Sequence, residues 1–447
     1  MLNRYIYSEL ERWKEKTPRK PLILRGARQV GKTTLIKMFS ETYAQSIILN
    51  LEKSADRTFF EKTDNIKEIV ESIFFNQNIE LGDDPVLLFI DEIQESPEAI
   101  RMLRYFYEDY PQIHVIAAGS LLEFALAYVS SFPVGRVEYL YLYPFNFIEF
   151  LEAIKHTQAL KQLVQVPISN FAHETLLKLF NNYVIIGGMP EVVKVYSENN
   201  SMLQLSDIYE SLWSSYKDDA EKYAHNNTEK KIIKHIIETA PFAIDKRIKF
   251  EGFGNSNYRS REVGEAMRSL NAAQVVQLIY PTTAIEPPIQ ADLKKSPRLQ
   301  FLDTGLLNYA LGIQAEMIGV KDLNDTYKGA IIPHMVTQEL IALNHVNLQK
   351  PHFWVREKAQ SVSEVDIVIS FQNLLIPIEI KSGSSGSLRS LHEFVNRSNH
   401  PYAIRIYAGE FKIEENKTPA GKNYFLMNLP YYLSSKIYDY ANYLVSK

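Results

Sequence analysis

The stretch Pro21-Leu-Ile-Leu-Arg-Gly26-Ala-Arg-Gln-Val-Gly31-Lys32-Thr33-Thr34 decides the fold expected for the first part of the chain. An apolar segment leads into Gly-x-x-x-x-Gly-Lys-Thr, and a helical pattern, Thr34-Leu-Ile-Lys-Met-Phe39, follows. This order of strand, glycine loop and helix is typical of a loop that binds phosphate. Gly26 and Gly31 allow a tight turn with its N–H groups facing inward, and the helix N-terminus adds partial positive charge.

The loop residues have distinct expected roles. Lys32 is expected to reach the β- and γ-phosphates of a nucleoside triphosphate, and the hydroxyl of Thr33 is expected to bind Mg²⁺. ATP with Mg²⁺ is therefore the predicted ligand. The predicted nucleotide-binding residues are Gly26, Ala27, Arg28, Gln29, Val30, Gly31, Lys32, Thr33 and Thr34.

A second motif, Pro85-Val-Leu-Leu-Phe-Ile-Asp91-Glu92-Ile93, lies farther along the chain. Its apolar run followed by two carboxylates indicates a central parallel strand that is buried on both faces and ends at the ligand crevice. Asp91 is expected to hold Mg²⁺, and Glu92 to orient or deprotonate the attacking water. The alternative is a strand that ends in a surface acidic pair; the phosphate loop upstream favours the catalytic interpretation.

Two more polar residues are candidates for the same site. Ser120 ends the apolar segment that starts at His114, where it could contact the γ-phosphate or water, or else cap a helix from Leu121 to Ala127. Arg136 starts another expected strand and is a candidate catalytic residue. It could stabilise the γ-phosphate of its own or of a neighbouring subunit, or it could be merely solvated.

The composition limits the class of protein. The chain has 447 residues, of which 46% are hydrophobic and 23% charged, as in globular proteins with a large core. The net charge of −4 means that any nucleic-acid surface must be local. The absence of cysteine excludes disulfides, thiol catalysis and Cys-ligated zinc. We find neither the apolar core of a signal peptide nor an apolar run that could cross a membrane, so we expect a cytoplasmic protein.

Alternating buried strands and helices in residues 1–150 predict an α/β fold with a parallel sheet. The phosphate loop and the second carboxylate, Glu92, next to Asp91 point to the class that includes AAA-type P-loop ATPases. Residues 151–225 have a helical pattern and are expected to form a lid or connector. In that connector, the turn at Gly187-Gly188 is interpreted as packing rather than a hinge. The segment Tyr216-Lys-Asp-Asp219 is interpreted as a solvated face or a domain contact rather than a metal site, because adjacent helical residues point in different directions.

Residues 226–322 have the outline of a winged helix: two helical stretches followed by two strand-like segments. Residues 226–300 carry twelve Lys or Arg against eight Asp or Glu, so this part is locally basic. DNA is the expected partner, through Arg259, Arg261 and Arg268; dimerisation or protein docking is the alternative. After this module, Asp303 is expected to cap a helix from Leu306.

Residues 323–447 carry a candidate second metal site. Glu379 and Lys381 are two apart on an expected strand and share a face, which Asp366 reaches if the preceding strand pairs with it as a hairpin. Such a triad can hold one Mg²⁺ and position a hydroxide, as in restriction-type nucleases. The alternative is a sheet edge with an internal salt bridge.

Together these motifs resemble a family of prokaryotic AAA-type ATPases that carry a C-terminal domain of unknown function. The resemblance implies ATP and Mg²⁺ as ligands and a C-terminal module with a restriction-endonuclease fold. The family commonly has a glutamate in the helix after Lys328-Gly-Ala330, where this chain has Pro333-His334 and only Glu339 nearby. The matching segments are 24–33, 88–94, 119–120, 135–137, 187–191, 301–306, 364–366 and 378–381.

The predicted function is Mg²⁺-dependent ATP hydrolysis coupled to DNA through the C-terminal modules. Two alternatives remain: a nucleotide-gated protein-binding switch with an inactive nuclease-like domain, and an ATP-regulated nuclease. A protein partner or a homo-oligomer is compatible with each of them. We expect no membrane partner.

Overall fold

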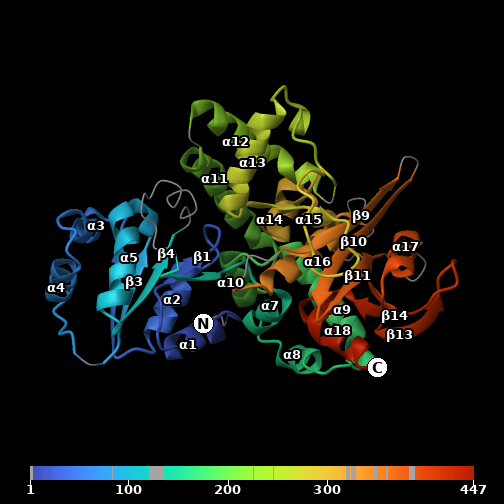
Figure 1. Cartoon of the computed structure of the whole chain (residues 1–447), viewed down its shortest axis with the longest axis horizontal. Coiled ribbons are helices and arrows are strands. Elements are labelled where there is room, and N and C mark those ends of the chain that lie inside the picture. Colours follow the sequence, from blue (N-terminus) through green and yellow to red (C-terminus); the bar gives the residue numbers. More distant parts are fainter. Residues whose placement is uncertain are drawn as a thin grey trace.

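The computed structural model describes residues 4–82, 84–119, 135–224, 226–244, 246–318, 323, 329–346, 350–358, 361–381 and 388–447. Three regions are visible in Figure 1: an N-terminal sheet with its helices on the left, a group of helices at the top, and a C-terminal sheet on the right. No helix among the described residues is long and apolar enough to span a bilayer.

The N-terminal sheet is parallel throughout and confirms the predicted P-loop fold class. Its strand order is β2-β3-β4-β1-β5, so β4 separates the strand before the glycine loop, β1, from the strand with the acidic pair, β3. The strands are β1 (Leu22–Arg25), β2 (Gln45–Asn50), β3 (Val86–Asp91), β4 (Ile113–Ala118) and β5 (Glu138–Tyr141).

Alternate residues of each strand point to opposite sides of the sheet, and in β3 the residues on both sides are buried. Helices accordingly cover both faces. Leu87 and Phe89 of β3 are in the same apolar core as α1 (Tyr7–Glu15) and α2 (Lys32–Ser40). Leu88 and Ile90 pack in a second core. That second core is covered by α3 (Ser54–Glu61), α4 (Ile66–Asn76) and α5 (Pro97–Asp109).

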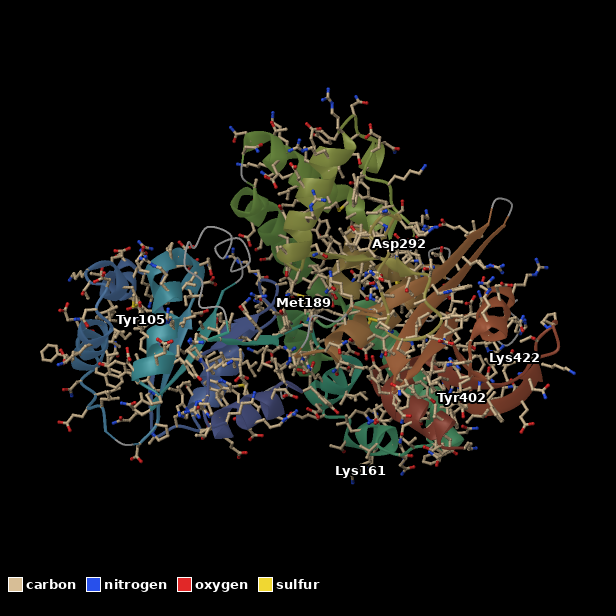
Figure 2. The ribbon with its side chains drawn as sticks, in the orientation of Figure 1. Tyr105, Lys161, Met189, Asp292, Tyr402 and Lys422 are labelled. Carbon is tan, nitrogen blue, oxygen red and sulfur yellow. The ribbon has the colours of Figure 1, made fainter. Side chains whose placement is uncertain are left out.

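A group of helices follows the first sheet and extends in Figure 1 from the bottom of the molecule, through its middle, to the helices at the top. Met189, at its centre in Figure 2, is fully buried. The helices are α7 (Phe147–Ala153), α8 (Thr157–Leu163), α9 (His173–Ile186), α10 (Pro190–Asn199) and α11 (Ser206–Tyr223). The expected helical connector is therefore present.

The next region has the predicted sequence of helices and strands. Two strands, β6 (Val276–Ile279) and β8 (Arg298–Phe301), pair antiparallel after the helices, while the short β7 (Pro281–Thr282) adds to the C-terminal sheet. The helices are α12 (Asn227–Thr239), α13 (Ser260–Ala272), α14 (Thr304–Leu311) and α15 (Gln314–Met317).

The C-terminal sheet has seven strands in the order β13-β14-β12-β11-β10-β9-β7. Strands β9, β10 and β11 form an antiparallel meander, and α17 (Arg389–Arg397) crosses over so that β12 runs parallel to β11. The strands are β9 (His352–Lys358), β10 (Ser361–Phe371), β11 (Leu374–Ile380), β12 (Tyr402–Tyr407), β13 (Lys412–Lys417) and β14 (Asn423–Pro430). The domain also contains α16 (Ile331–Ala342) and α18 (Ile437–Val445), and it fits the predicted α/β class.

The connector packs closely against the start of α14 at Gly187 and Gly188. Asp303 accepts the N–H of Leu306 at 3.1 Å, which confirms the predicted helix cap, and it also accepts the N–H of Gly188 at 2.6 Å. A side chain at Gly187 would collide with this carboxylate. The paired glycines thus serve packing, as the sequence suggested.

Candidate functional site

The glycine loop leaves β1 at Arg25 and enters α2 at Lys32. Gly31 has φ +95°, a left-handed conformation that glycine adopts without strain. A Cβ at Gly26 would collide with the carbonyl oxygen of Leu142, so a larger residue could not occupy that position without moving the backbone. The first N–H groups of α2 have no partner within the helix and are available to an anion.

Lys32 is buried inside this loop. Its Nζ donates hydrogen bonds of 2.9 Å to the carbonyl oxygens of Gly26 and Ala27. Burial lowers the pKa of Lys32 to about 8, opposed by the nearby charges of Glu92 and Asp91. A phosphate group would give this buried ammonium a negatively charged partner at close range.

Thr33 joins the loop to the acidic motif. Its Oγ1 donates a hydrogen bond of 2.7 Å to Oδ2 of Asp91, at the end of β3. Burial raises the pKa of Asp91, and the hydrogen bond from Thr33 opposes that rise. A hydroxyl and a carboxylate oxygen are ligands that suit Mg²⁺, so these two residues fit the ion expected here.

Glu92 is held by a residue that the sequence analysis left without a role. Gln94 Nε2 donates a hydrogen bond of 2.7 Å to Oε2 of Glu92, whose backbone has φ +51°. The Gln94 side chain lies against Gly119 at the end of β4, and a Cβ at that glycine would collide with it. A glutamine two residues after the acidic pair, with a glycine after the neighbouring strand, is a signal that could have suggested this contact.

Helix α11 closes over the loop. Asp219 forms an ion pair with Arg28, and the Tyr216 hydroxyl donates a hydrogen bond of 2.6 Å to the Arg28 carbonyl oxygen. The interpretation of residues 216–219 as a domain contact is therefore confirmed. Arg4, which the sequence analysis did not single out, donates a hydrogen bond of 3.0 Å to the carbonyl oxygen of Val30.

The remaining candidates near the loop do not join it in this structure. Ser120 lies outside the described residues. Arg136 precedes β5, whose residue Glu138 is level with Leu22 at the start of β1. Arg136 therefore lies at the edge of the sheet opposite the loop, where it forms a 2.9 Å ion pair with Glu108. It does not act on its own chain's loop here, and action across a subunit interface stays a prediction.

The structure brings the three C-terminal candidates together. Strands β10 and β11 pair as a hairpin, and Asp366 Oδ2 accepts the N–H of Ile380 at 2.9 Å. Lys381 Nζ lies 2.8 Å from Oε1 of Glu379. Burial, followed by the charge of Asp366, raises the pKa of Glu379 to about 7. Oε2 of Glu379 is buried without a hydrogen-bond partner.

Arg298 of β8 inserts a positive charge into this cluster. Its guanidinium pairs with Glu364, lies 3.6 Å from Oδ1 of Asp366, and stacks 4.6 Å from the ring centre of Phe353. Within the described part of the chain, no group of three or more acidic or histidine side chains is arranged to hold a metal ion. The guanidinium of Arg298 thus lies beside Asp366, one of the three candidate residues.

Glu339, the glutamate of α16 that follows Pro333-His334 in the sequence, does not join the triad. It is fully buried in α16 and accepts hydrogen bonds from the Phe147 N–H at 3.1 Å and the Tyr183 hydroxyl at 2.7 Å. Burial raises its pKa to about 8. His334, on the same helix, accepts the N–H of Phe301 at 3.0 Å, and burial lowers its pKa to about 3. Helix α16 thus joins the C-terminal domain to the connector.

The five-stranded parallel sheet, the glycine loop and the Thr33–Asp91 pair define a P-loop domain. Residues 18–151 match the family model of an AAA domain, so this part of the chain is a P-loop AAA-type ATPase domain. Residues 177–317 and 328–432 match two families described as domains of unknown function, DUF8612 and DUF4143.

Three solved structures match parts of this chain. The Walker-type ATPase PABY2304 of Pyrococcus abyssi is 15% identical, with 70% of this chain and 96% of that chain covered and a TM-score of 0.46. PCH-2 of C. elegans is 14% identical, with 40% and 55% covered and a TM-score of 0.24. The S. cerevisiae Hsp104–ADP complex is 15% identical, with 60% and 37% covered and a TM-score of 0.26. Comparison with curated proteins gave no match.

Proposed function

We propose that this protein binds ATP with Mg²⁺ in its glycine loop and hydrolyses the γ-phosphate. The observation that carries the proposal is the 2.7 Å hydrogen bond between Thr33 and Asp91, beside the buried Lys32. These residues come from two separate motifs, and their contact places a cation, a hydroxyl and a carboxylate around one loop.

Each residue has one task in this proposal. Lys32 and the first N–H groups of α2 bind the phosphates, and Thr33 and Asp91 hold Mg²⁺, which neutralises charge on the phosphate oxygens when bound. Glu92, oriented by Gln94, accepts a proton from the attacking water. The roles of Ser120 and Arg136 stay predictions; Arg136 can act only in a homo-oligomer that brings it to a neighbouring loop.

The test is steady-state phosphate release with Mg²⁺ and with a chelator. Lys32→Ala should lose ATP affinity, whereas Glu92→Gln should still bind ATP but turn over about 10²- to 10⁴-fold more slowly. Glu95→Gln, which changes an exposed glutamate in the same segment, is the matched control. Equal turnover in Glu92→Gln and the unaltered protein would refute the assignment of Glu92 as the base.

We further infer that ATP turnover in residues 1–150 is coupled to DNA through the connector, residues 151–225. The DNA would be bound by residues 226–322 and by the C-terminal domain, residues 323–447. We place this activity in the cytoplasm. Support comes from the locally basic composition and from exposed arginines of α13 and the residue before it: Arg259, Arg261 and Arg268. DNA should stimulate ATP hydrolysis, and higher salt should weaken that effect because phosphate contacts release counterions. Turnover that ignores DNA would favour a protein partner.

One observation favours the second candidate, a nucleotide-gated switch with an inactive nuclease-like domain. Arg298 places a fixed cation next to Asp366, close to where an active nuclease would hold a metal ion. In this case, plasmid DNA should stay intact with Mg²⁺ or Mn²⁺. Cleavage that disappears in Asp366→Ala would instead identify an ATP-regulated nuclease.

A further inference from the structure

A large cavity lies away from the glycine loop, between α13, the segment from Tyr280 to Leu293, α16 and β10. Its volume is about 940 Å³, which is at the upper end of the range for sites that take small organic ligands. In Figure 2 the labelled Asp292 marks the segment that passes between the upper helices and the C-terminal strands. The cavity is thus built by both C-terminal modules together.

Two cations line the cavity, and none of the described lining residues is acidic. Lys350 donates a hydrogen bond to Asn271 Oδ1, a neutral acceptor that also receives the N–H of Leu278 at 3.0 Å. Burial alone lowers the pKa of Lys350 to about 8, because no carboxylate compensates its charge. Arg268 of α13 is the second cation. The nearby Asp292 carboxylate accepts the N–H of Lys294 at 3.1 Å.

The rest of the wall offers flat and apolar surface. Tyr280, His352 and Tyr438 line the cavity, and the ring of His352 is fixed by a 2.9 Å contact between its Nδ1 and the Tyr280 carbonyl oxygen. Proteins that bind single-stranded nucleic acids combine aromatic rings with positive charges, because every base can stack on a ring and every phosphate is negative.

We propose that this cavity receives one nucleotide of a single-stranded nucleic acid, with its phosphate at Lys350 and Arg268 and its base against the aromatic wall. The inference rests on the proposed coupling to DNA and names its site. A strand is favoured over a free nucleotide because this cavity adjoins a second, smaller one, whereas the charge of Arg261 on α13 is already paired with Glu265 at 3.0 Å. His352 also lines the smaller cavity beside Asp366, so a strand leaving the cavity passes the carboxylate cluster.

The test is the binding of a short 5′-fluorescein-labelled oligothymidylate to the full chain, followed by fluorescence anisotropy over a series of salt concentrations. Lys350→Gln should weaken binding about tenfold and reduce the slope of log K against log salt by about 0.7, the value for one phosphate contact. Lys350→Arg should restore most of the affinity, and Asp292→Asn should increase it. Lys178→Gln removes the same charge from an exposed site on α9 and should have no effect.

Circular dichroism melting confirms that each variant folds. Oligothymidylate binding that is unchanged in Lys350→Gln would overturn the cavity assignment while leaving the coupling to DNA intact. If the unaltered protein does not bind oligothymidylate, both the cavity assignment and the proposed coupling to DNA are refuted. Thymidine monophosphate, tested in Lys32→Ala so that the glycine loop does not compete, should bind far more weakly than the oligomer. Equal affinity would overturn the proposal that the ligand is a strand rather than a free nucleotide.

Discussion

The hydroxyl of Thr33 lies 2.7 Å from the carboxylate of Asp91, although 58 residues separate them in the chain. Strand β4 lies between β1 and β3, so the contact does not come from neighbouring strands. It arises because α2 begins directly after the loop and its first turn reaches the end of β3. The contact fits the predicted fold, and it brings together the two residues that we propose to hold Mg²⁺.

Thr33→Val keeps the shape of the side chain but removes the hydroxyl. We expect affinity for ATP to fall about tenfold when Mg²⁺ is present and to change little in a chelator, because only the metal loses a ligand. Titration calorimetry under both conditions measures the two values. Thr175→Val, which makes the same change at an exposed position of α9, should leave both unchanged. An equal loss with and without Mg²⁺ would show that Thr33 does not bind the ion.

Gln94→Ala should release the Glu92 carboxylate from its 2.7 Å hydrogen bond. We expect kcat to fall roughly ten- to a hundredfold with little change in KM, because the base is misplaced while the phosphate contacts remain. Gly119→Ala should reproduce this loss, since its methyl group would displace Gln94. Gln112→Ala, before β4, is the control. A raised KM at unchanged kcat would contradict a positioning role.

The motif residues could be predicted because their arrangement is local. A strand, a glycine loop and a helix that follow each other without interruption can place Lys32 and Thr33 in only a few ways. The same holds for Asp303, whose capping bond to Leu306 spans three residues.

The residues that the sequence analysis missed depend on contacts between distant segments. Arg4 binds both the glycine loop and Glu149, and Arg298 pairs with Glu364 on another module. Nothing in the residues next to Arg4 or Arg298 indicates such partners, because tertiary packing brings them together. Arg136 is a related case: its distance from the loop follows from the direction of β5, which a strand-like pattern does not reveal.

Glu339 should make stability depend on pH. Burial raises its pKa from 4.5 to about 8, so between these values the folded state keeps a proton that the unfolded state has lost. Its contribution is therefore fully present below about pH 4.5 and is lost as the pH rises through about 8. Glu339→Gln stays neutral, so we expect melting temperatures close to those of the unaltered protein at pH 5 and higher ones at pH 9.

The control for this series is Glu339→Ala, which removes the acceptor altogether. The Phe147 N–H would then be buried without its acceptor, at a cost of about 1–3 kcal/mol, although the Tyr183 hydroxyl keeps its 2.6 Å hydrogen bond to the Phe145 carbonyl oxygen. The variant should therefore be less stable at every pH. Parallel pH profiles for Glu339→Gln and the unaltered protein would mean that Glu339 ionises normally in the folded state.

Arg298→Ala should uncover a divalent-cation site. Without the guanidinium, the ion pair between Lys381 and Glu379 is what the described residues leave to balance the carboxylates of Glu364, Asp366 and Glu379. We therefore expect a lower melting temperature in a chelator. A divalent cation can replace the lost charge, and Mn²⁺ should therefore raise the melting temperature of the variant more than that of the unaltered protein.

Arg247→Ala is the matched control for Arg298→Ala, because it removes a guanidinium whose ion pair, with Glu357 at 2.7 Å, lies outside the cluster. Its response to Mn²⁺ should equal that of the unaltered protein. If the unaltered protein already responds as strongly as Arg298→Ala, Arg298 does not block the site and the active nuclease becomes the better interpretation. A response confined to Arg298→Ala would mean that this arginine keeps metal out of the nuclease-like domain, which leaves that domain free to serve as a binding module.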